Sequence, residues 1–194
     1  VYSAMSDKLH QLWDEGTPVD TITFSGNGEP TMHPAFPQII DFTLQLRDKL
    51  YPSAKVSVLT NASQLGKQEV RDALMKIDNP ILKIDSPLEW MVEAINIPNQ
   101  AYSLQKTIEN IKLFNHNFIL QTMFLKGVEN GVEIDCTNVE HVEKWRDLVR
   151  ELAPREVMMY TIDRETPAKN LQKVTVEEME AIAAPLKEEG FNIQ

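Results

Sequence analysis

The alternation of two kinds of apolar segment constrains the fold of this chain more than any other feature of its sequence. Short runs rich in β-branched and aromatic residues alternate with longer stretches whose apolar residues recur every three or four positions. Short runs bounded by turn residues are typical of strands that are buried on both faces of a sheet. The five runs predicted to form strands are 20–25, 55–60, 81–85, 118–125 and 156–162.

Helical periodicity fills the segments between these runs, and strands that alternate with helices favour a parallel sheet with right-handed crossovers. A helix is also predicted from about residue 2 to residue 13, with no strand before it. Because a closed barrel of this type needs about eight strands, the sequence predicts an α/β fold that is an open, partial TIM-type barrel. It has about five parallel strands, helices outside and its first strand missing. The other predicted helices are 36–46, 70–77, 104–114, 139–152 and about 175–190.

The last predicted helix carries the clearest end signals. Thr175 and Glu178 form a T-x-x-E capping box at its start, and Gly190 suits a left-handed cap at its end. Pro185 lies late in this helix, and we expect it to kink or shorten the helix because proline removes a backbone donor.

Length, charge and cysteine content narrow the class of protein. A chain of 194 residues fits one domain, 1–194, with a single sizeable core. The net charge of −10 argues against non-specific binding to DNA or to an anionic membrane surface. The chain has no apolar stretch of membrane-spanning length, no visible signal peptide and only one cysteine, Cys136. We therefore expect a cytoplasmic protein with no DNA or membrane partner.

The most informative motif follows the first predicted strand, where ligands bind in parallel α/β folds. The sequence there is G-N-G-E-P-T at 26–31, and its two glycines allow a sharp backbone turn. Glu29 adds a carboxylate suited to an ammonium group or a metal ion. The alternative is an ordinary turn in which Glu29 caps the next helix.

Several blocks of the sequence resemble the radical S-adenosylmethionine enzymes. The segment F-S-G-N-G-E-P-T is similar to the motif, usually written GGEP, that follows the second strand of that family. Together the blocks look most like the branch of Fe–S oxidoreductases related to the wyosine-base synthases, which modify tRNA. The further matching blocks are V-L-T-N at 58–61, L-K-I-D at 82–85, I-N-I-P at 95–98, F-L-K-G-V-E-N at 124–130 and R-x-x-P at 164–167.

This resemblance implies two cofactors, S-adenosylmethionine and a [4Fe–4S] cluster. The family holds the cluster through a C-x-x-x-C-x-x-C loop, which this sequence lacks because Cys136 is alone. We therefore expect a truncated radical S-adenosylmethionine core that starts in its first helix, binds no cluster or other metal itself, and is inactive alone. The full-length protein would reductively cleave S-adenosylmethionine at the cluster and generate a 5′-deoxyadenosyl radical.

The resemblance also implies roles for particular residues. The turn would hold the amino group of S-adenosylmethionine, and Asn61 would face the same pocket or else cap the next helix. The residues of the turn concerned are Gly26, Asn27, Gly28, Glu29 and Pro30.

The later strands supply further candidates. Lys83 and Asp85 share one side of a strand, where they would meet a carboxylate and ribose hydroxyls or instead form an ion pair with each other. Gln121 and Met123 also share a face and would contact ribose or adenine. The strand-end cations Lys126 and Arg164 suit an anionic substrate or the methionine carboxylate.

Two other functions stay open at this point. One is a Schiff-base lyase on an α/β barrel, with Lys83 or Lys126 as the reacting amine. The other is a binding module without a cluster. The substrate of the radical enzyme is equally open among a tRNA base, a glycine in a partner protein and a small metabolite.

Overall fold

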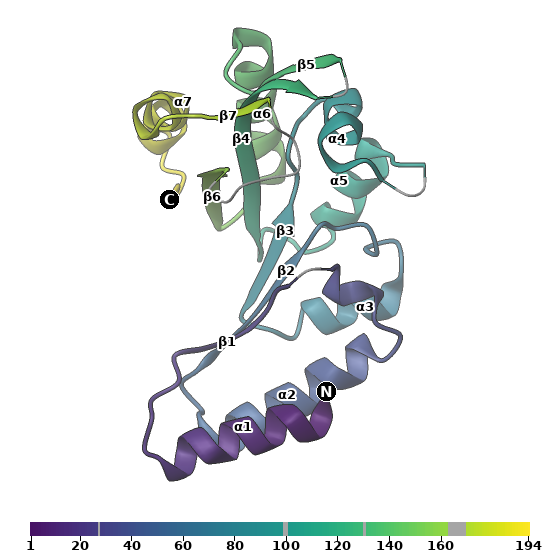
Figure 1. The fold of residues 1–194 in the computed structure, drawn as a ribbon, viewed down its shortest axis with the longest axis vertical. Helices are drawn as coiled ribbons and strands as arrows, with labels where there is room; N and C mark the ends of the chain where they lie inside the picture. Colours follow the sequence, from purple (N-terminus) through teal and green to yellow (C-terminus); the bar gives the residue numbers. More distant parts are fainter. Residues whose placement is uncertain (27, 99–100, 130, 163–169) are drawn as a thin grey trace. The chain divides into compact units, whose positions relative to one another are not determined.

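The structure is a computed structural model, and it describes residues 1–26, 28–98, 101–129, 131–162 and 170–194. The chain divides into two compact units, Val1–Ile81 and Leu82–Gln194 (Figure 1). The division falls inside one strand, β3, so each unit contains part of it. The two units are described in turn.

The first unit packs helices against a short parallel sheet. Strand β1 pairs with β2 in parallel, with Thr21 opposite Lys55 and Phe24 opposite Val58. Its elements are α1 (Tyr2–Asp14), β1 (Thr21–Phe24), the 3₁₀ helix η1 (Pro30–Met32), α2 (Phe36–Leu50), β2 (Lys55–Thr60), α3 (Gln68–Leu74) and the first part of β3 (Asn79–Lys83).

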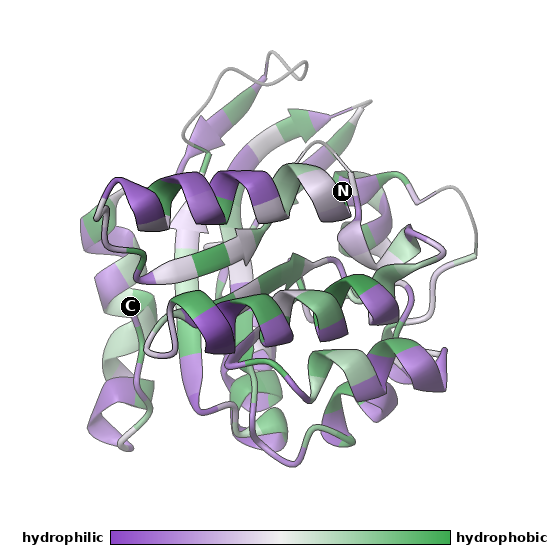
Figure 2. Cartoon of the chain, turned by 90° about the horizontal axis from the view of Figure 1, so that it is seen from below, coloured by the Kyte–Doolittle hydropathy of each residue, from purple (hydrophilic) through white to green (hydrophobic). Residues whose placement is uncertain are grey.

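Helix α1 is amphipathic and lies along α2 (Figure 1). It is largely hydrophilic, as the helix beside the N label in Figure 2 shows. Its buried residue, Leu9, packs with Leu46 and Leu50 of α2. The rings of Tyr2 and Phe42 meet edge to face with their centroids 5.1 Å apart. This apolar contact therefore fixes α1, although no side chain caps its first turn.

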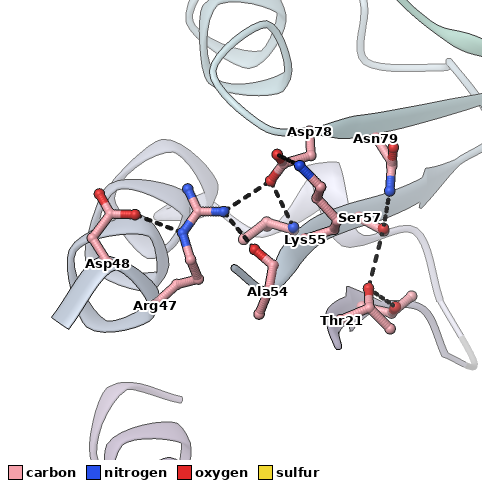
Figure 3. A network of polar contacts seen from close by, with 10 residues as sticks. Thr21, Arg47, Asp48, Ala54, Lys55, Ser57, Asp78 and Asn79 are labelled. Carbon is pink, nitrogen blue, oxygen red and sulfur yellow. Dashed lines mark hydrogen bonds and ion pairs between the residues drawn. The ribbon is translucent and has the colours of Figure 1, made fainter. Parts of the chain in front are cut away.

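A network of polar contacts surrounds Asp78 at the start of β2 in the first unit (Figure 3). Asp78 accepts hydrogen bonds from Val56 N at 2.9 Å, Arg47 Nη1 at 2.9 Å and Lys55 Nζ at 3.2 Å. Arg47 Nη1 also donates to Ala54 O at 2.7 Å. Burial alone would raise the pKa of Asp78, but the hydrogen bonds from Val56, Arg47 and Lys55 outweigh it and lower that pKa.

The second unit is organised around β4. Six residues of β4, from Ile119 to Phe124, pair in parallel with β6, whereas its last residues pair antiparallel with β5 and β7. The remaining elements of this unit are the end of β3, α4 (Glu89–Asn96), α5 (Leu104–Lys112), β4 (Ile119–Glu129), β5 (Val132–Asp135), α6 (Val139–Leu152), β6 (Glu156–Thr161), β7 (Leu171–Lys173) and α7 (Val176–Glu188).

Trp145 of α6 anchors the core of the second unit. Its side chain is fully buried, and its ring meets Phe124 edge to face at 5.1 Å. The indole Nε1 donates to Thr122 Oγ1 at 3.1 Å, and that hydroxyl donates to Ile84 O at 2.8 Å. A buried hydrogen-bonded chain therefore joins α6, β4 and the segment after β3, and it leaves no donor unpaired.

The predicted fold class is confirmed: the chain is an α/β structure with an open sheet of mainly parallel strands and surrounding helices. The five predicted strands correspond to β1, β2, β3, β4 and β6, with ends that shift by a few residues. The described residues contain two further short strands that were not predicted, β5 and β7, and both pair antiparallel with β4. The reason is that β4 continues to Glu129, so that its end extends beyond β6 and pairs with two short antiparallel strands.

Helix ends followed the predictions in most cases. The capping box of Thr175 and Glu178 is present at the start of α7. Gly190 has a φ of +97°, as a left-handed cap requires. Pro185 lies inside α7, but the helix continues to Glu188, so proline does not end it. Helix α4 was not predicted, because eight residues give too short a pattern. That residues 1–194 form a single domain stays a prediction.

Among the described helices, none has the length and apolar character that crossing a bilayer requires.

Candidate functional site

The turn after β1 is held by its own glutamate. Glu29 is the N-cap residue of η1, and its Oε1 accepts from Thr31 N at 3.1 Å. Pro30 follows in the first turn, where a missing N–H costs nothing. Glu29 therefore caps the short helix η1, as the alternative expected, and its role toward a ligand stays a prediction. Gly26 and Gly28 are exposed beside it, and Asn27 lies outside the described residues.

The same carboxylate also ties this turn to the end of β2. Oε1 accepts from Thr60 Oγ1 at 2.6 Å and from Thr31 Oγ1 at 2.5 Å, whereas Oε2 accepts from Asn61 N at 2.7 Å. Thr31 and Thr60 are almost fully buried, and Glu29 itself is half-buried. One carboxylate thus joins the carboxyl ends of two neighbouring parallel strands.

All the donors to Glu29 are neutral. Within the described residues it has no Lys, Arg or His partner, so its negative charge is not compensated by a cation. An ionised carboxylate accepts about four hydrogen bonds, two at each oxygen. Oε1 already receives three donors, but Oε2 receives one. The arrangement therefore leaves acceptor capacity at Oε2 and a charge suited to a cationic ligand.

Asn61 takes part through its backbone and caps a turn with its side chain. Its Oδ1 accepts from Ser63 N at 3.0 Å. The prediction that Asn61 caps the next helix is wrong, because α3 begins at Gln68 with Lys67 as its N-cap residue. The next residue, Ala62, has a φ of +62°, and its N–H donates to Thr60 Oγ1 at 3.1 Å.

Lys83 and Asp85 form the ion pair that was one of the two alternatives for them. Lys83 Nζ lies 2.6 Å from Asp85 Oδ2, and Asp85 is 1% exposed. Asp85 also accepts from Asn96 Nδ2 at 2.9 Å and from Met123 N at 3.3 Å. A buried carboxylate needs such partners. Asp85 therefore organises the ends of β3 and α4 against β4.

Gln121 and Met123 lie half-buried on one face of β4, as predicted from their spacing. The parallel register places Met158 opposite Gln121 and Tyr160 opposite Met123, so these residues share that face. Burial first, and then the nearby charge of Asp85, raise the pKa of the Tyr160 phenol. Sequence analysis missed Tyr160, and its alternation with Met158 along β6 is the signal that would have found it.

The two strand-end cations differ in what the structure shows of them. Lys126 forms an ion pair with Glu178, the residue that completes the capping box of α7. Arg164 lies outside the described residues. Asn96 was inside the matched block I-N-I-P, but its bond to Asp85 spans eleven residues and has no local signal.

The candidate residues thus form two groups, one in each unit. Glu29 and Asn61 meet in the first unit, and Lys83, Asp85 and Met123 meet in the second. Among the described residues, no three His, Cys, Asp or Glu side chains are grouped as metal ligands. Burial raises the pKa of the Cys136 thiol to about 11, which keeps it protonated.

The sequence is similar to several known proteins, and it matches only part of the length of each protein named below. No family model matches the sequence. A UPF0026 protein of Methanocaldococcus jannaschii is 24% identical over 192 residues, which is 97% of this chain and 55% of that protein. A UPF0026 protein of Synechocystis is 30% identical over 159 residues, 80% of this chain and 54% of the relative. The chain spans about half of the length of these two relatives.

A third relative has a different name. The GTPase Obg of Brachyspira hyodysenteriae is 27% identical over 166 residues, but the match covers only 23% of that protein. A nucleotide-binding P-loop has the pattern G-x-x-x-x-G-K-[ST], which does not occur in this sequence. The match therefore gives no reason to expect GTP binding by these residues.

Solved structures show the fold directly. SuiB of Streptococcus suis, in a crystal structure with bound S-adenosylmethionine, superposes with a TM-score of 0.69 at 16% identity, over 100% of this chain and 43% of SuiB. A domain of pyruvate-formate lyase-activating enzyme from Bacteroides vulgatus gives a TM-score of 0.61 at 17% identity, covering 89% of this chain and 96% of that domain. These likenesses show that the chain shares the fold of these proteins.

Proposed function

We propose that this chain is the S-adenosylmethionine-binding core of a radical S-adenosylmethionine enzyme. The observation that carries the proposal is the carboxylate of Glu29, which lies at the carboxyl ends of β1 and β2 with no cation beside it among the described residues. The shared fold with S-adenosylmethionine-bound SuiB supports it. In the full-length protein, reductive cleavage of this cofactor at a [4Fe–4S] cluster would supply a 5′-deoxyadenosyl radical.

The chemistry of the ligand fits the open side of Glu29. The amino group of S-adenosylmethionine is an ammonium with three N–H donors, and carboxylate and carbonyl oxygens are its natural partners. Oε2 of Glu29 has one neutral donor, Asn61 N, and can accept another. The exposed glycines Gly26 and Gly28 leave the neighbouring backbone accessible. We therefore assign Glu29 and this turn to the methionine amino group.

The candidate residues of the second unit are assigned on the motif resemblance. Asp85 is already paired with Lys83, so we propose that the pair acts through the Lys83 side chain, which is 23% exposed beside the buried carboxylate. Gln121 and Met123 offer an amide and a thioether on a half-buried face, suited to ribose or adenine. Lys126 and Arg164 would meet an anionic substrate or the methionine carboxylate. A relation to wyosine-base synthases belongs to the same proposal, and the substrate would be a tRNA base, a glycine in a partner protein or a small metabolite.

The residues of this chain do not fit the cluster itself. Three thiolates are needed, and the sequence has one cysteine, whose buried thiol has a raised pKa. We therefore assign the binding of S-adenosylmethionine, and not that of the cluster, to this chain.

The ion pairs of the second unit argue against a Schiff-base lyase. A reacting lysine must lose its proton, and a lowered pKa produces the neutral amine. Lys83 is paired with Asp85 and Lys126 with Glu178, so each amine is held in an ion pair and neither is free to attack a carbonyl carbon. Trapping with borohydride and a carbonyl substrate should therefore label neither lysine.

Titration of S-adenosylmethionine into the chain by calorimetry tests the proposal. Glu29→Gln removes the charge and keeps the shape, so it should weaken binding by about 1.5–3 kcal/mol, roughly ten- to a hundredfold. Glu15→Gln is the matched control, because Glu15 is an exposed carboxylate that accepts from Gln11 at 2.7 Å in the same unit. Equal affinities for the unchanged chain and the Glu29→Gln variant would contradict the proposal.

A further inference from the structure

The two threonines that donate to Glu29 have no role in the function proposed above. We propose that Thr31 and Thr60 are positioning residues, whose hydroxyl groups occupy Oε1 of Glu29 and thereby reserve Oε2 for the cationic group of the ligand. This inference rests on the proposed function, because it concerns how Glu29 is presented to S-adenosylmethionine.

The first step is the crowding of one carboxylate oxygen. Oε1 lies 2.5 Å from Thr31 Oγ1, 2.6 Å from Thr60 Oγ1 and 3.1 Å from Thr31 N. Short contacts of this length are typical of hydroxyl groups that donate to an ionised carboxylate. With three donors in place, Oε1 has no room for a fourth. A ligand that approaches Glu29 therefore meets Oε2.

The second step is the direction of the Thr60 proton. A hydroxyl group has one proton and two lone pairs. Thr60 Oγ1 accepts from Ala62 N at 3.1 Å, so its single proton is free to point at Glu29. Ala62 has a φ of +62°, a conformation that alanine adopts only when its surroundings hold it. Thr60 therefore fixes both the turn after β2 and the carboxylate.

The third step is burial. Thr31 is 2% exposed and Thr60 is 3% exposed, so water cannot readily replace either hydroxyl group. The carboxylate is held by Thr31 of η1 and Thr60 of β2, which are two different elements of the fold. A carboxylate held in this way keeps one orientation before the ligand arrives, which reduces the entropic cost of binding.

Valine substitutions separate this role from a purely structural one. Thr60→Val and Thr31→Val keep the shape of the side chain and remove the donated proton. Each should weaken the binding of S-adenosylmethionine about three- to tenfold, as expected for a lost hydrogen bond of about 0.5–1.5 kcal/mol. Thr60→Ser keeps the hydroxyl group and should restore most of the affinity. Circular dichroism checks that each variant is folded. If Thr60→Val does not fold, Thr31→Val takes its place as the test.

Thr43→Val is the matched control. Thr43 is a fully buried threonine of the same unit, and its hydroxyl group donates to Ile39 O at 2.7 Å inside α2. Its loss should lower the melting temperature as much as the loss of Thr60 does, and it should leave the affinity unchanged. If Thr43→Val weakens binding as strongly as Thr60→Val, the threonines act through stability alone and the inference is overturned.

A double-mutant cycle completes the experiment. If Thr60 acts through Glu29, adding Thr60→Val to Glu29→Gln should weaken binding no further, because the group that Thr60 orients has lost its charge. Additive losses would overturn the inference and leave the proposed function intact. If Glu29→Gln itself binds like the unchanged chain, or if the unchanged chain does not bind S-adenosylmethionine, the proposed function fails, and the inference fails with it.

Discussion

At each end of β2, a carboxylate accepts a hydrogen bond from a backbone N–H group, but the two carboxylates differ in their other partners. At the start of β2, Asp78 accepts from the backbone N–H of Val56 at 2.9 Å. At the end of β2, Glu29 accepts from the backbone N–H of Asn61 at 2.7 Å. Asp78 is neutralised by Arg47 and Lys55, whereas Glu29 has only neutral donors among the described residues. The charge of Asp78 is therefore balanced by two cations, whereas the charge of Glu29 has no cationic partner among the described residues.

This difference matches the position of each carboxylate in the sheet. In parallel α/β folds, the carboxyl ends of the strands hold the active site, and residues at the amino ends mainly contribute to stability. Paired charges at the amino end satisfy one another within the protein. A carboxylate without a cationic partner at the carboxyl end is therefore a candidate for contact with a cationic ligand. The comparison leads to four predictions.

The largest expected effect on stability concerns a buried histidine whose ring nitrogens have no hydrogen-bond partner among the described residues. His141 is fully buried, and both ring nitrogens lack a hydrogen-bond partner among the described residues. Burial lowers its pKa from 6.5 to about 4. The unfolded chain therefore takes up a proton first as the pH falls, and stability declines between about pH 6.5 and pH 4. At 1.36 kcal/mol per pKa unit, the total loss is about 3 kcal/mol.

Urea unfolding of the chain and of His141→Phe at pH 7, 5 and 4 measures this effect. The phenyl ring preserves the edge-to-face contact with Phe124, whose ring centroid is 6.1 Å from that of His141. The variant should lose part of the pH dependence seen in the unchanged chain. The same slope in both proteins would show that His141 is not the group responsible.

Opening the network at the start of β2 should have the next largest effect. Asp78→Ala leaves the Arg47 guanidinium and Val56 N without their acceptor, and the expected loss of stability at pH 7 is about 2–3 kcal/mol. Because the pKa of Asp78 is lowered in the folded state, its contribution is complete above about pH 4 and is lost as the pH falls further. Urea midpoints at pH 7 and pH 3 measure both parts. An unchanged midpoint at pH 7 would contradict the structural role of the network.

Gly127 tests how tightly β4 holds its antiparallel partner. Its φ is +134°, and a Cβ atom there would lie 2.1 Å from Asn170 O. Gly127→Ala should therefore separate β4 from β7 and destabilise the chain by about 1–3 kcal/mol. Lys173 of β7 pairs with Leu125 of β4, so the backbone amide of Lys173 should exchange its hydrogen faster in the variant. Retained protection there would show that the strand tolerates the methyl group.

The smallest effect is expected for the ion pair of Lys126 and Glu178. Both side chains are about one third exposed, and exposed pairs contribute about 0–1 kcal/mol. Glu178→Gln should therefore lower the melting temperature only slightly, with part of the loss due to the capping box. A large loss that disappears at high salt would indicate that this pair is more important than its exposure implies.

The strands and the turn were predictable because their signals are local. The short apolar run at 55–60 forms β2, and most of its residues are buried, as such a run predicts. The capping box of α7 needs only Thr175 and Glu178. The turn at 26–31 was found because glycine, glutamate and proline have separate physical roles there.

The remainder depends on contacts between residues distant in the sequence. Thr60 lies 31 residues from Glu29, and nothing near either residue indicates their hydrogen bond. Strand β7 has three residues and forms only because β4 extends far enough to pair with it. The ion pair of Lys83 with Asp85 was one of two alternatives, because spacing alone places two side chains on one face without showing what they bind.

We propose that the charge of Glu29 serves a ligand, whereas the charge of Asp78 stabilises the fold. Calorimetric titration of S-adenosylmethionine into the unchanged chain, Glu29→Gln and Asp78→Ala, with urea unfolding of the same samples, separates these two roles. Glu29→Gln should weaken binding roughly ten- to a hundredfold at a loss of about 1 kcal/mol of stability or less. Asp78→Ala should show the reverse pattern. A Glu29→Gln variant that unfolds readily but binds unchanged would contradict the claim.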